Sequence, residues 1–514
     1  MASGFVVRKN QYYDSVFLMS VNKRLAGSPG VQQTAVLMGS EKNKQLLANI
    51  GIQDVQIDAA QPNDLIVAVV AESPEIVSAV LAKTDEALDA LAETSPTSSL
   101  HTLEDGLVHG AGANLAVISI PGEHAAREAR KALAAGLNVF LFSSNVAIDD
   151  EVALKQLAAQ KGLFVMGPDC GTSLIGGVGI GFANVVRQGP IGVVGASGTG
   201  LQEFTSQVHN AGFGISHAIG TGSHDLSDRV GGLTTFAALD ALESDCQTKV
   251  IAIISKPPGA QTLVQLISRM RTCQKPVVVC LLGTRLEAKG AGSVFQVANT
   301  IDDAVRLAIA EAGGQAPGPP ALLSAEEQEW LVREKAAWSR QQKYLRGLFA
   351  GGTFCYQSQQ VLKEAGFTVY SNAALDPKNE LSDPDHSREH TVVDMGDDHY
   401  TLGRPHPMID GTMRQQRILT EGRDPQVAVL LLDVILGYNA AKDPVGELLD
   451  AITAAKQTAQ KRGSHLTVVA SICGTEGDPQ DLSLQTQLLR EAGAIVFHSS
   501  GRAVAFCSEL LKDR

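Results

Sequence analysis

The sequence contains an internal repeat, in which two segments carry the same features in the same order. Gly198-Thr199 is followed by Ala211-Gly212-Phe213, and at the same spacing Gly352-Thr353 is followed by Ala365-Gly366-Phe367. In both segments the Gly-Thr pair follows an apolar run and opens a stretch with helical character. Such self-similarity is typical of a duplicated structural unit. We interpret residues 190–312 and 341–514 as two copies of one flavodoxin-like α/β domain.

The chain ahead of the repeat also alternates apolar runs with helical stretches. Residues 114–120 are almost continuously apolar and lead into a helical stretch, and apolar runs follow at 138–142 and 164–166. This pattern predicts strands covered on both faces in a parallel sheet. We therefore expect an α/β protein built from several parallel-sheet Rossmann-like and flavodoxin-like domains. The remaining expected parts are an N-terminal α/β domain at 1–110, a Rossmann-like domain at 111–189, and a linker with a helix at 313–340.

Charge and cysteine content exclude several classes of protein. The net charge of −13 argues against binding to nucleic acid or to an anionic membrane surface. The longest apolar runs are too short to span a bilayer, and the N-terminus has no pattern of a signal peptide. The seven cysteines include no Cys-x-x-Cys pair, which argues against a disulfide framework and against zinc. We expect a cytoplasmic protein with reduced thiols.

The repeat further predicts an anion site. If the two copies pack about a pseudo-twofold axis, their Gly-Thr turns can face one point, and each helix N-terminus offers backbone N–H groups and partial positive charge. The alternative is that each turn is only a tight connection from strand to helix. The expected phosphate-binding residues are Ser197, Gly198, Thr199 and Gly200 in the first copy and Gly351, Gly352 and Thr353 in the second.

Several motifs resemble the two subunits of succinyl-CoA synthetase. Gly167-Pro168-Asp169-Cys170-Gly171 and the run 192–199 resemble its α subunit. The run 393–398, followed by Asp424-Pro425-Gln426, resembles the C-terminal ligase domain of its β subunit. The resemblance implies a CoA-binding-type domain at 111–189, two ligase domains in the repeat, and a substrate-binding role for Asp169.

Nearly the whole chain is similar to the FdrA family, whose members fuse these parts. The motifs that carry this resemblance are Tyr13-Asp14-Ser15-Val16, Phe142-Ser143-Ser144-Asn145-Val146, Ser255-Lys256-Pro257-Pro258 and the run 403–410. The resemblance implies a subunit of an oxamate carbamoyltransferase in allantoin catabolism, which works with two companion subunits, or a paralogue with another carbamoyl donor. That reaction converts oxalurate and phosphate into oxamate and carbamoyl phosphate.

The sequence departs from a synthetase at two positions that matter for chemistry. The synthetase phosphorylates a histidine, but the corresponding stretch, 288–293, contains none. Where the synthetase has a glutamate that orients this histidine, Lys256 stands here, and a lysine suits a free phosphate dianion. We therefore expect phosphate or carbamoyl phosphate as substrate and assign Lys256 a catalytic role. The alternative is that Lys256 is a solvated surface residue.

Nucleotide and coenzyme sites are not recognisable in the sequence. There is no P-loop, and an ATP-grasp domain would need about two hundred further residues. The glycine-rich fingerprint of a CoA-binding Rossmann unit is also missing, and Pro121-Gly122-Glu123-His124 is weak support for one, which makes coenzyme A a doubtful ligand. No metal or redox cofactor is expected.

The loop at 397–406 holds two further candidate residues. Arg404 and His406 are expected to contact a carboxylate, carbamoyl or phosphate group, and we assign them catalytic roles. A structural loop whose polar groups satisfy one another is the alternative. A metal site is not expected, because the acidic and histidine side chains here lack the spacing of ligands on fixed elements.

Three hypotheses follow for the function. The first is a carbamoyltransferase subunit that binds phosphate or carbamoyl phosphate between two helix N-termini. The second is an acyl-CoA synthetase-like subunit that needs a separate ATP-grasp partner. The third is a scaffold subunit without catalytic activity. In each case we expect companion subunits in a hetero-oligomer and self-association of this chain.

Overall fold

The computed structural model describes residues 2–11, 13, 15–49, 51–92, 100, 102–110, 112–284, 286, 295–315, 323–401 and 404–512. These residues form two compact units. One comprises residues 1–112 with 402–405, and the other comprises residues 113–401 with 406–514. No helix in the described ranges is long and apolar enough to cross a membrane.

The N-terminal unit is a three-stranded sheet of order β1-β3-β2 with helices on both faces. Strand β3 (Leu65–Ala71) lies between β1 (Ala2–Arg8) and β2 (Val31–Met38) and is antiparallel to both. Helix α1 (Ser15–Ala26) connects β1 to β2, so the unit is a split β-α-β arrangement. Its other helices are α2 (Glu41–Asn49), α3 (Val55–Asp58), α4 (Pro74–Ala82), α5 (Thr84–Ala92) and α6 (Leu103–His109).

The second unit begins with a small parallel sheet of order β4-β5-β6. Its strands are β4 (Leu115–Ile118), β5 (Asn138–Leu141) and β6 (Val165–Met166), and its helices are α7 (Gly122–Ala134) and α8 (Ile148–Lys161). This is the parallel arrangement that the apolar runs predicted. At the start of α7, a Cβ on Gly122 would lie 2.2 Å from the carbonyl oxygen of Ser144, so glycine here permits close packing of two turns.

A seven-stranded sheet follows, in the order β13-β12-β11-β9-β10-β7-β8. Strands β9 to β13 are mutually parallel, whereas β7 and β8 form an antiparallel hairpin on the edge. The first strand of this sheet begins at Thr172, ahead of residue 190, where the first copy of the repeat was expected to begin. Its strands are β7 (Thr172–Ile175), β8 (Val178–Gly181), β9 (Gln188–Gly195), β10 (Ile215–Gly220), β11 (Val250–Ser255), β12 (Val277–Leu281) and β13 (Phe295–Ala298). Helices α9 (Gly198–Asn210) and α12 (Ile301–Glu311) pack on one face, and α10 (Leu233–Ser244) and α11 (Ala260–Thr272) on the other.

The C-terminal part is a five-stranded, fully parallel sheet of order β15-β14-β16-β17-β18. Its strands are β14 (Tyr344–Phe349), β15 (Thr391–Asp394), β16 (Val427–Ile435), β17 (Thr467–Cys473) and β18 (Ile495–Phe497). The helices on one face are α13 (Ala325–Ala337), α14 (Gly352–Glu364) and α19 (Ser500–Leu511), and those on the other are α16 (Thr412–Arg423), α17 (Gly446–Lys461) and α18 (Leu482–Glu491). The short helix α15 (Asp398–Thr401) follows β15.

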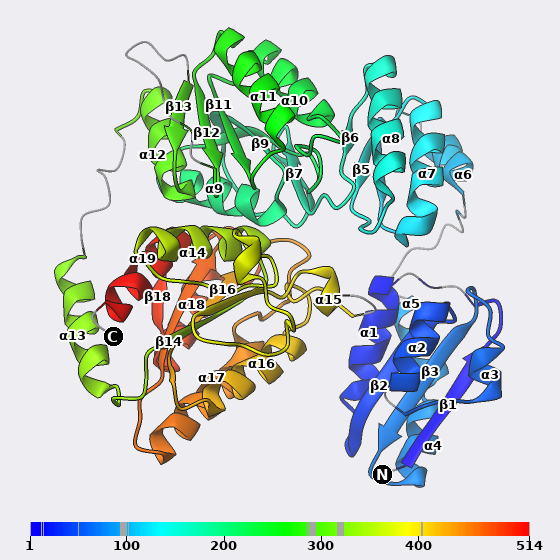
Figure 1. Cartoon of the computed structure of the whole chain (residues 1–514). Helices are drawn as coiled ribbons and strands as arrows, with labels where there is room; N and C mark the ends of the chain where they lie inside the picture. The colour runs from blue at the N-terminus through cyan, green and yellow to red at the C-terminus, as the bar shows by residue number, and fades with distance from the viewer. Residues whose placement is uncertain are drawn as a thin grey trace. The chain divides into compact units, whose positions relative to one another are not determined.

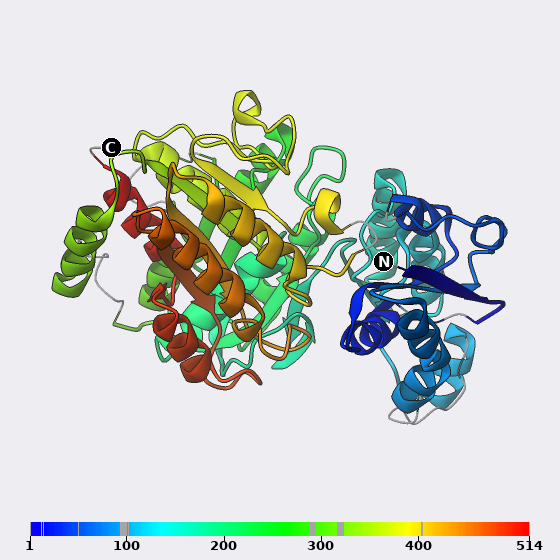
Figure 2. The same ribbon diagram turned by 90° about the horizontal axis from the view of Figure 1, so that it is seen from below.

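The two large sheets match the predicted repeat and confirm the expected fold class. In each sheet an interior strand, β9 or β14, leads into the helix that the Gly-Thr pair opens. Helices α9 and α14 contact each other, and Figure 1 shows both between the two sheets. Figure 2 shows α16 and α17, in gold and orange, on the other face of the C-terminal sheet.

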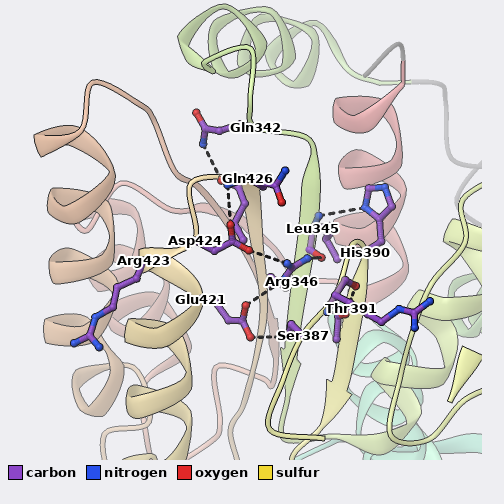
Figure 3. A network of polar contacts seen from close by, with 12 residues as sticks. Gln342, Leu345, Arg346, Ser387, His390, Thr391, Glu421, Arg423, Asp424 and Gln426 are labelled. Carbon is purple, nitrogen blue, oxygen red and sulfur yellow. Dashed lines mark hydrogen bonds and ion pairs between the residues drawn. The ribbon is translucent and has the colours of Figure 1, made fainter. Parts of the chain in front are cut away.

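A buried ion network fixes the N-terminal edge of the C-terminal sheet (Figure 3). The guanidinium of Arg346 on β14 is 2% exposed and donates to Glu421 at 2.9 Å and to Asp424 at 3.0 Å. Glu421 also accepts from Arg417 and Ser387. The network stands at the starts of β14, β15 and β16, so it anchors the edge opposite to the strand ends that lead into α14.

Candidate functional site

The N-termini of α9 and α14 form the centre of the candidate site. Helix α9 begins at Gly198 with Ser197 as its N-cap, and α14 begins at Gly352 with Gly351 as its N-cap. The side chain of Ser197 makes no hydrogen bond to the backbone of its helix, and Gly351 has no side chain. Each 13-residue helix therefore presents its first amides and the positive end of its dipole without a side-chain cap.

The two N-termini meet across the repeat, as the sequence predicted. The hydroxyl groups of Ser197 and Thr353 are in hydrogen-bond contact. A Cβ on Gly200 would lie 3.1 Å from Cγ2 of Thr353, and a Cβ on Gly351 would lie 3.0 Å from Cβ of Thr199. Glycine at these positions lets the two helix starts approach closely. The predicted Ser, Gly and Thr residues thus form one cluster.

Lys256 belongs to this cluster. It directly follows β11, and its Nζ lies 4.9 Å from the centre of the Tyr356 ring. The same Nζ lies 3.5 Å from the position of a Cβ on Gly352. Its half-buried ammonium group therefore stands at the start of α14 and can add positive charge there.

Asp394, which the sequence analysis did not single out as a site residue, also reaches the start of α14. It ends β15, is 7% exposed, and its Oδ2 lies 2.4 Å from the position of a Cβ on Gly352. Its Oδ1 accepts the backbone N–H of Gly396 at 3.0 Å. Burial raises the pKa of Asp394 to about 6, although Lys256 opposes this shift. The only sequence signal for Asp394 was an acidic residue at the end of a short apolar run.

Asp433 holds the loop that precedes α14. Its buried carboxylate accepts the backbone N–H groups of Ala350 and Gly351, and Arg414 donates to it at 2.8 Å. Sequence reasoning missed this residue. The signal was a single acidic side chain within the otherwise apolar strand β16.

His406 lies beside the same loop. A Cβ on Gly396 would lie 2.7 Å from His406 Nε2 and 3.2 Å from Asp394 Oδ1. Burial lowers the pKa of His406 to about 4, so the ring is neutral near pH 7. Its Nδ1 accepts the backbone N–H of Met408 at 3.2 Å, which places the proton of the neutral ring on Nε2. His406 can therefore donate a hydrogen bond toward the site.

Two other predicted residues lie outside this cluster of helix starts. Asp169 accepts a hydrogen bond of 2.6 Å from the hydroxyl of Ser223, and its carboxylate is close enough to Lys256 to feel the charge of that side chain. Arg404 is exposed and falls within residues 402–405, which cluster with the N-terminal unit, whereas His406 belongs to the second unit. The stretch 288–293 lies outside the described residues.

Three family models match parts of the chain. The model described as CoA-ligase matches residues 348–510, and the CoA binding domain matches residues 186–270. The model described as "AllF, heavy metal-associated domain" matches residues 1–103.

Individual proteins match as well. The chain is 42% identical to the protein YahF of Escherichia coli (strain K12), over 97% of both chains. It is 26% identical to the α subunit of the ADP-forming succinate–CoA ligase of Methanothermobacter thermautotrophicus, over 41% of this chain and 73% of that one. Acetyl-coenzyme A synthetase 1 of Ca. Korarchaeum cryptofilum aligns with a TM-score of 0.31 and 18% identity, covering 81% of this chain and 87% of that one.

The N-terminal unit does not fit a metal site of the cysteine type, although its family description mentions heavy metals. Residues 1–103 contain no cysteine. Within the described ranges of the whole chain, no three His, Cys, Asp or Glu side chains come together in a way that could hold a metal ion. We assign no chemical step to a metal.

Proposed function

Because the chain belongs to the FdrA-like family of succinyl-CoA synthetase-like proteins, we propose that it is the phosphate-binding subunit of an acyl-transferring enzyme. Its substrate would be inorganic phosphate or a mixed anhydride of phosphoric acid with a carboxylic or carbamic acid. The phosphate would lie between the N-termini of α9 and α14. The contact between Ser197 and Thr353 carries this proposal, because it joins two helix starts without side-chain caps.

The surrounding groups suit the binding of such a phosphate. Hydrogen-bond donors here are the backbone amides at two helix starts, the ammonium of Lys256, and whichever hydroxyl of Ser197 and Thr353 does not donate to the other. His406 Nε2–H adds a neutral donor nearby. Donors fixed in this way stabilise the negative charge that develops when phosphate attacks, or leaves, a carbonyl carbon.

The first candidate reaction is that of an acyl-CoA synthetase-like subunit with a separate ATP-grasp partner. The CoA-ligase and CoA-binding family models and the succinate–CoA ligase relatives favour it. They also make coenzyme A a plausible ligand, which would supply a thiol as acceptor of the acyl group. At the start of α7, the carbonyl oxygens of Ser144 and Asn145 lie where a Cβ on residue 122 would be, so this turn requires glycine.

The second candidate is carbamoyl transfer, which one observation favours. No histidine occurs between residues 225 and 385, and Lys256 stands at the anion site. Without a histidine, this stretch cannot carry a phosphohistidine, so the phosphate that binds here is better described as free phosphate. In this reaction a phosphate oxygen forms a bond to the carbamoyl carbon of oxalurate, the C–N bond breaks, and the nitrogen of oxamate takes up a proton.

In either case we place the chain in the cytoplasm, in a complex with companion subunits and with self-association. A third alternative is a scaffold that binds an anion while its partners catalyse the reaction. Full activity of the complex after Ser197, Thr199 and Lys256 are all changed to Ala would support the scaffold.

The phosphate site is tested by calorimetric titration of the full chain with inorganic phosphate. Lys256→Met should weaken binding by about tenfold or more, because a charged hydrogen-bond donor is lost. Lys249→Met is the matched control, since Lys249 is exposed and stands just before the other end of β11. Equal affinity of both variants and the wild type would reject the site.

The reaction is tested with the companion subunits present. Phosphate release from carbamoyl phosphate that requires oxamate supports carbamoyl transfer, and ATP hydrolysis that requires coenzyme A supports the ligase. Carbamoyl transfer is rejected if no ureido-forming acceptor releases phosphate.

A further inference from the structure

A buried carboxylate stands within the proposed anion site. Asp394 Oδ2 lies 2.4 Å from the position of a Cβ on Gly352, the first residue of α14, and Lys256 Nζ lies 3.5 Å from that position. An acceptor and a cation thus flank the same helix start. A carboxylate repels a fully ionised anion, so its presence at an anion site requires an explanation.

Asp394 is held rigidly in this place. Its backbone N–H donates to the side-chain oxygen of Asn372 at 2.9 Å, and the amide nitrogen of Asn372 donates to its carbonyl oxygen at 2.9 Å. Oδ1 accepts the N–H of Gly396. Among the residues that the structure describes, no hydrogen-bond donor is assigned to Oδ2, although the side chain is 7% exposed. This oxygen is a fixed acceptor that a ligand can use.

We infer that Asp394 Oδ2 accepts a hydrogen bond from a protonated oxygen of the bound phosphate, and that this contact selects phosphate over sulfate. The inference rests on the proposed phosphate site and defines its ligand. Inorganic phosphate keeps one proton at about pH 8, whereas sulfate keeps none and would meet the carboxylate without a proton between them. The site would therefore take inorganic phosphate, the attacking species in anhydride formation and the product of anhydride cleavage.

The neighbouring charges agree with this assignment. The charged and titratable groups around Asp394 are Lys256 after β11, Asp397 in its own loop, Asp433 on β16, Cys355 and Tyr356 on α14, and His406. The thiol, the phenol and the neutral histidine add no negative charge near pH 7. Lys256 thus supplies positive charge next to Asp394. This charge can offset part of the negative charge of the carboxylate when the phosphate binds.

The test compares inorganic phosphate with sulfate by calorimetric titration of the full chain at about pH 8. The wild type should bind phosphate at least about tenfold more tightly than sulfate, and Asp394→Asn should reduce this ratio to about one, because the amide can donate to either ion. Asp398→Asn, an exposed carboxylate four residues further on, is the matched control and should keep the wild-type ratio. Thermal unfolding of Asp394→Asn shows whether the variant is folded.

The outcomes separate this inference from the proposed function. Equal binding of both ions by the wild type would overturn the role of Asp394 and leave the anion site intact. An unchanged ratio in folded Asp394→Asn would overturn it as well. Binding of neither ion by the wild type would overturn the anion site itself and the inference with it.

Discussion

The hydroxyl of Ser197 contacts the hydroxyl of Thr353, which lies 156 residues further along the chain. Ser197 precedes α9 in the first copy of the repeat, and Thr353 is in the first turn of α14 in the second. The contact therefore joins equivalent helix starts from two copies of one fold. An anion bound at this point would be held by both copies at once.

Removal of one of these hydroxyls should weaken phosphate binding. Thr353→Val keeps the shape of the buried side chain but loses the donor, which should reduce the affinity for phosphate by about three- to tenfold. Thr458→Val on the exposed face of α17 is the control for the same change of side chain. Calorimetric titration measures both. An unaltered affinity in Thr353→Val would exclude this hydroxyl from the site.

Close approach of the two helix starts should depend on glycine. A Cβ at position 351 would lie 2.9 Å from Phe354 and 3.0 Å from Thr199, so Gly351→Ala should push the helices apart. We expect phosphate affinity to fall by about tenfold or more, since small displacements of a fixed site are costly. Gly106→Ala on α6 introduces a methyl group where no atom lies within 4 Å, and should leave binding unchanged. The idea fails if both alanine variants bind like the wild type.

Asp394 should make the protein less stable as the pH rises. Its folded pKa of about 6 is above the ordinary value of 3.8, so the folded state holds a proton that the unfolded state has lost. Stability should therefore fall as the pH rises from about 4 to about 6. Asp394→Asn should raise the free energy of unfolding at about pH 7.5 by on the order of 1–3 kcal/mol, with little effect at about pH 4. Urea unfolding at both values measures this, and a gain of equal size at both would contradict it.

The buried ion network should contribute to stability and not to binding. Arg346→Met leaves Glu421 and Asp424 without their shared partner, which should cost about 3–5 kcal/mol in the free energy of unfolding. Arg423→Met, an exposed residue drawn beside the network in Figure 3, should change it by less than about 0.5 kcal/mol. Both variants should bind phosphate normally wherever they remain folded, because the network stands at the opposite edge of the sheet. Weaker binding in folded Arg346→Met would argue against this separation.

Much of the fold could be predicted from local patterns. Apolar runs between glycine turns predicted the parallel strands, because β9, β11, β14 and β16 are covered on both faces by helices. The antiparallel sheet of the N-terminal unit was not predicted. Its strands also alternate with helices, and only the pairing of β3 between β1 and β2 distinguishes it.

The site could be predicted in part. The repeat placed Ser197 and Thr353 together because equivalent positions in duplicated domains can meet at a symmetry axis. Asp394 was missed because its distance from Gly352 depends on the packing of β15 beside β14, which no local pattern encodes. Arg404 and His406 were predicted to act together because they lie only two positions apart in the sequence. The boundary between the two compact units falls between them.

Both helix starts that would hold the phosphate are parts of one polypeptide chain and of one compact unit. Neither has to find the other by diffusion, so each is present near its counterpart at a high effective concentration. Dilution of the protein should therefore leave these two halves assembled. The same covalent connection fixes their ratio at one to one.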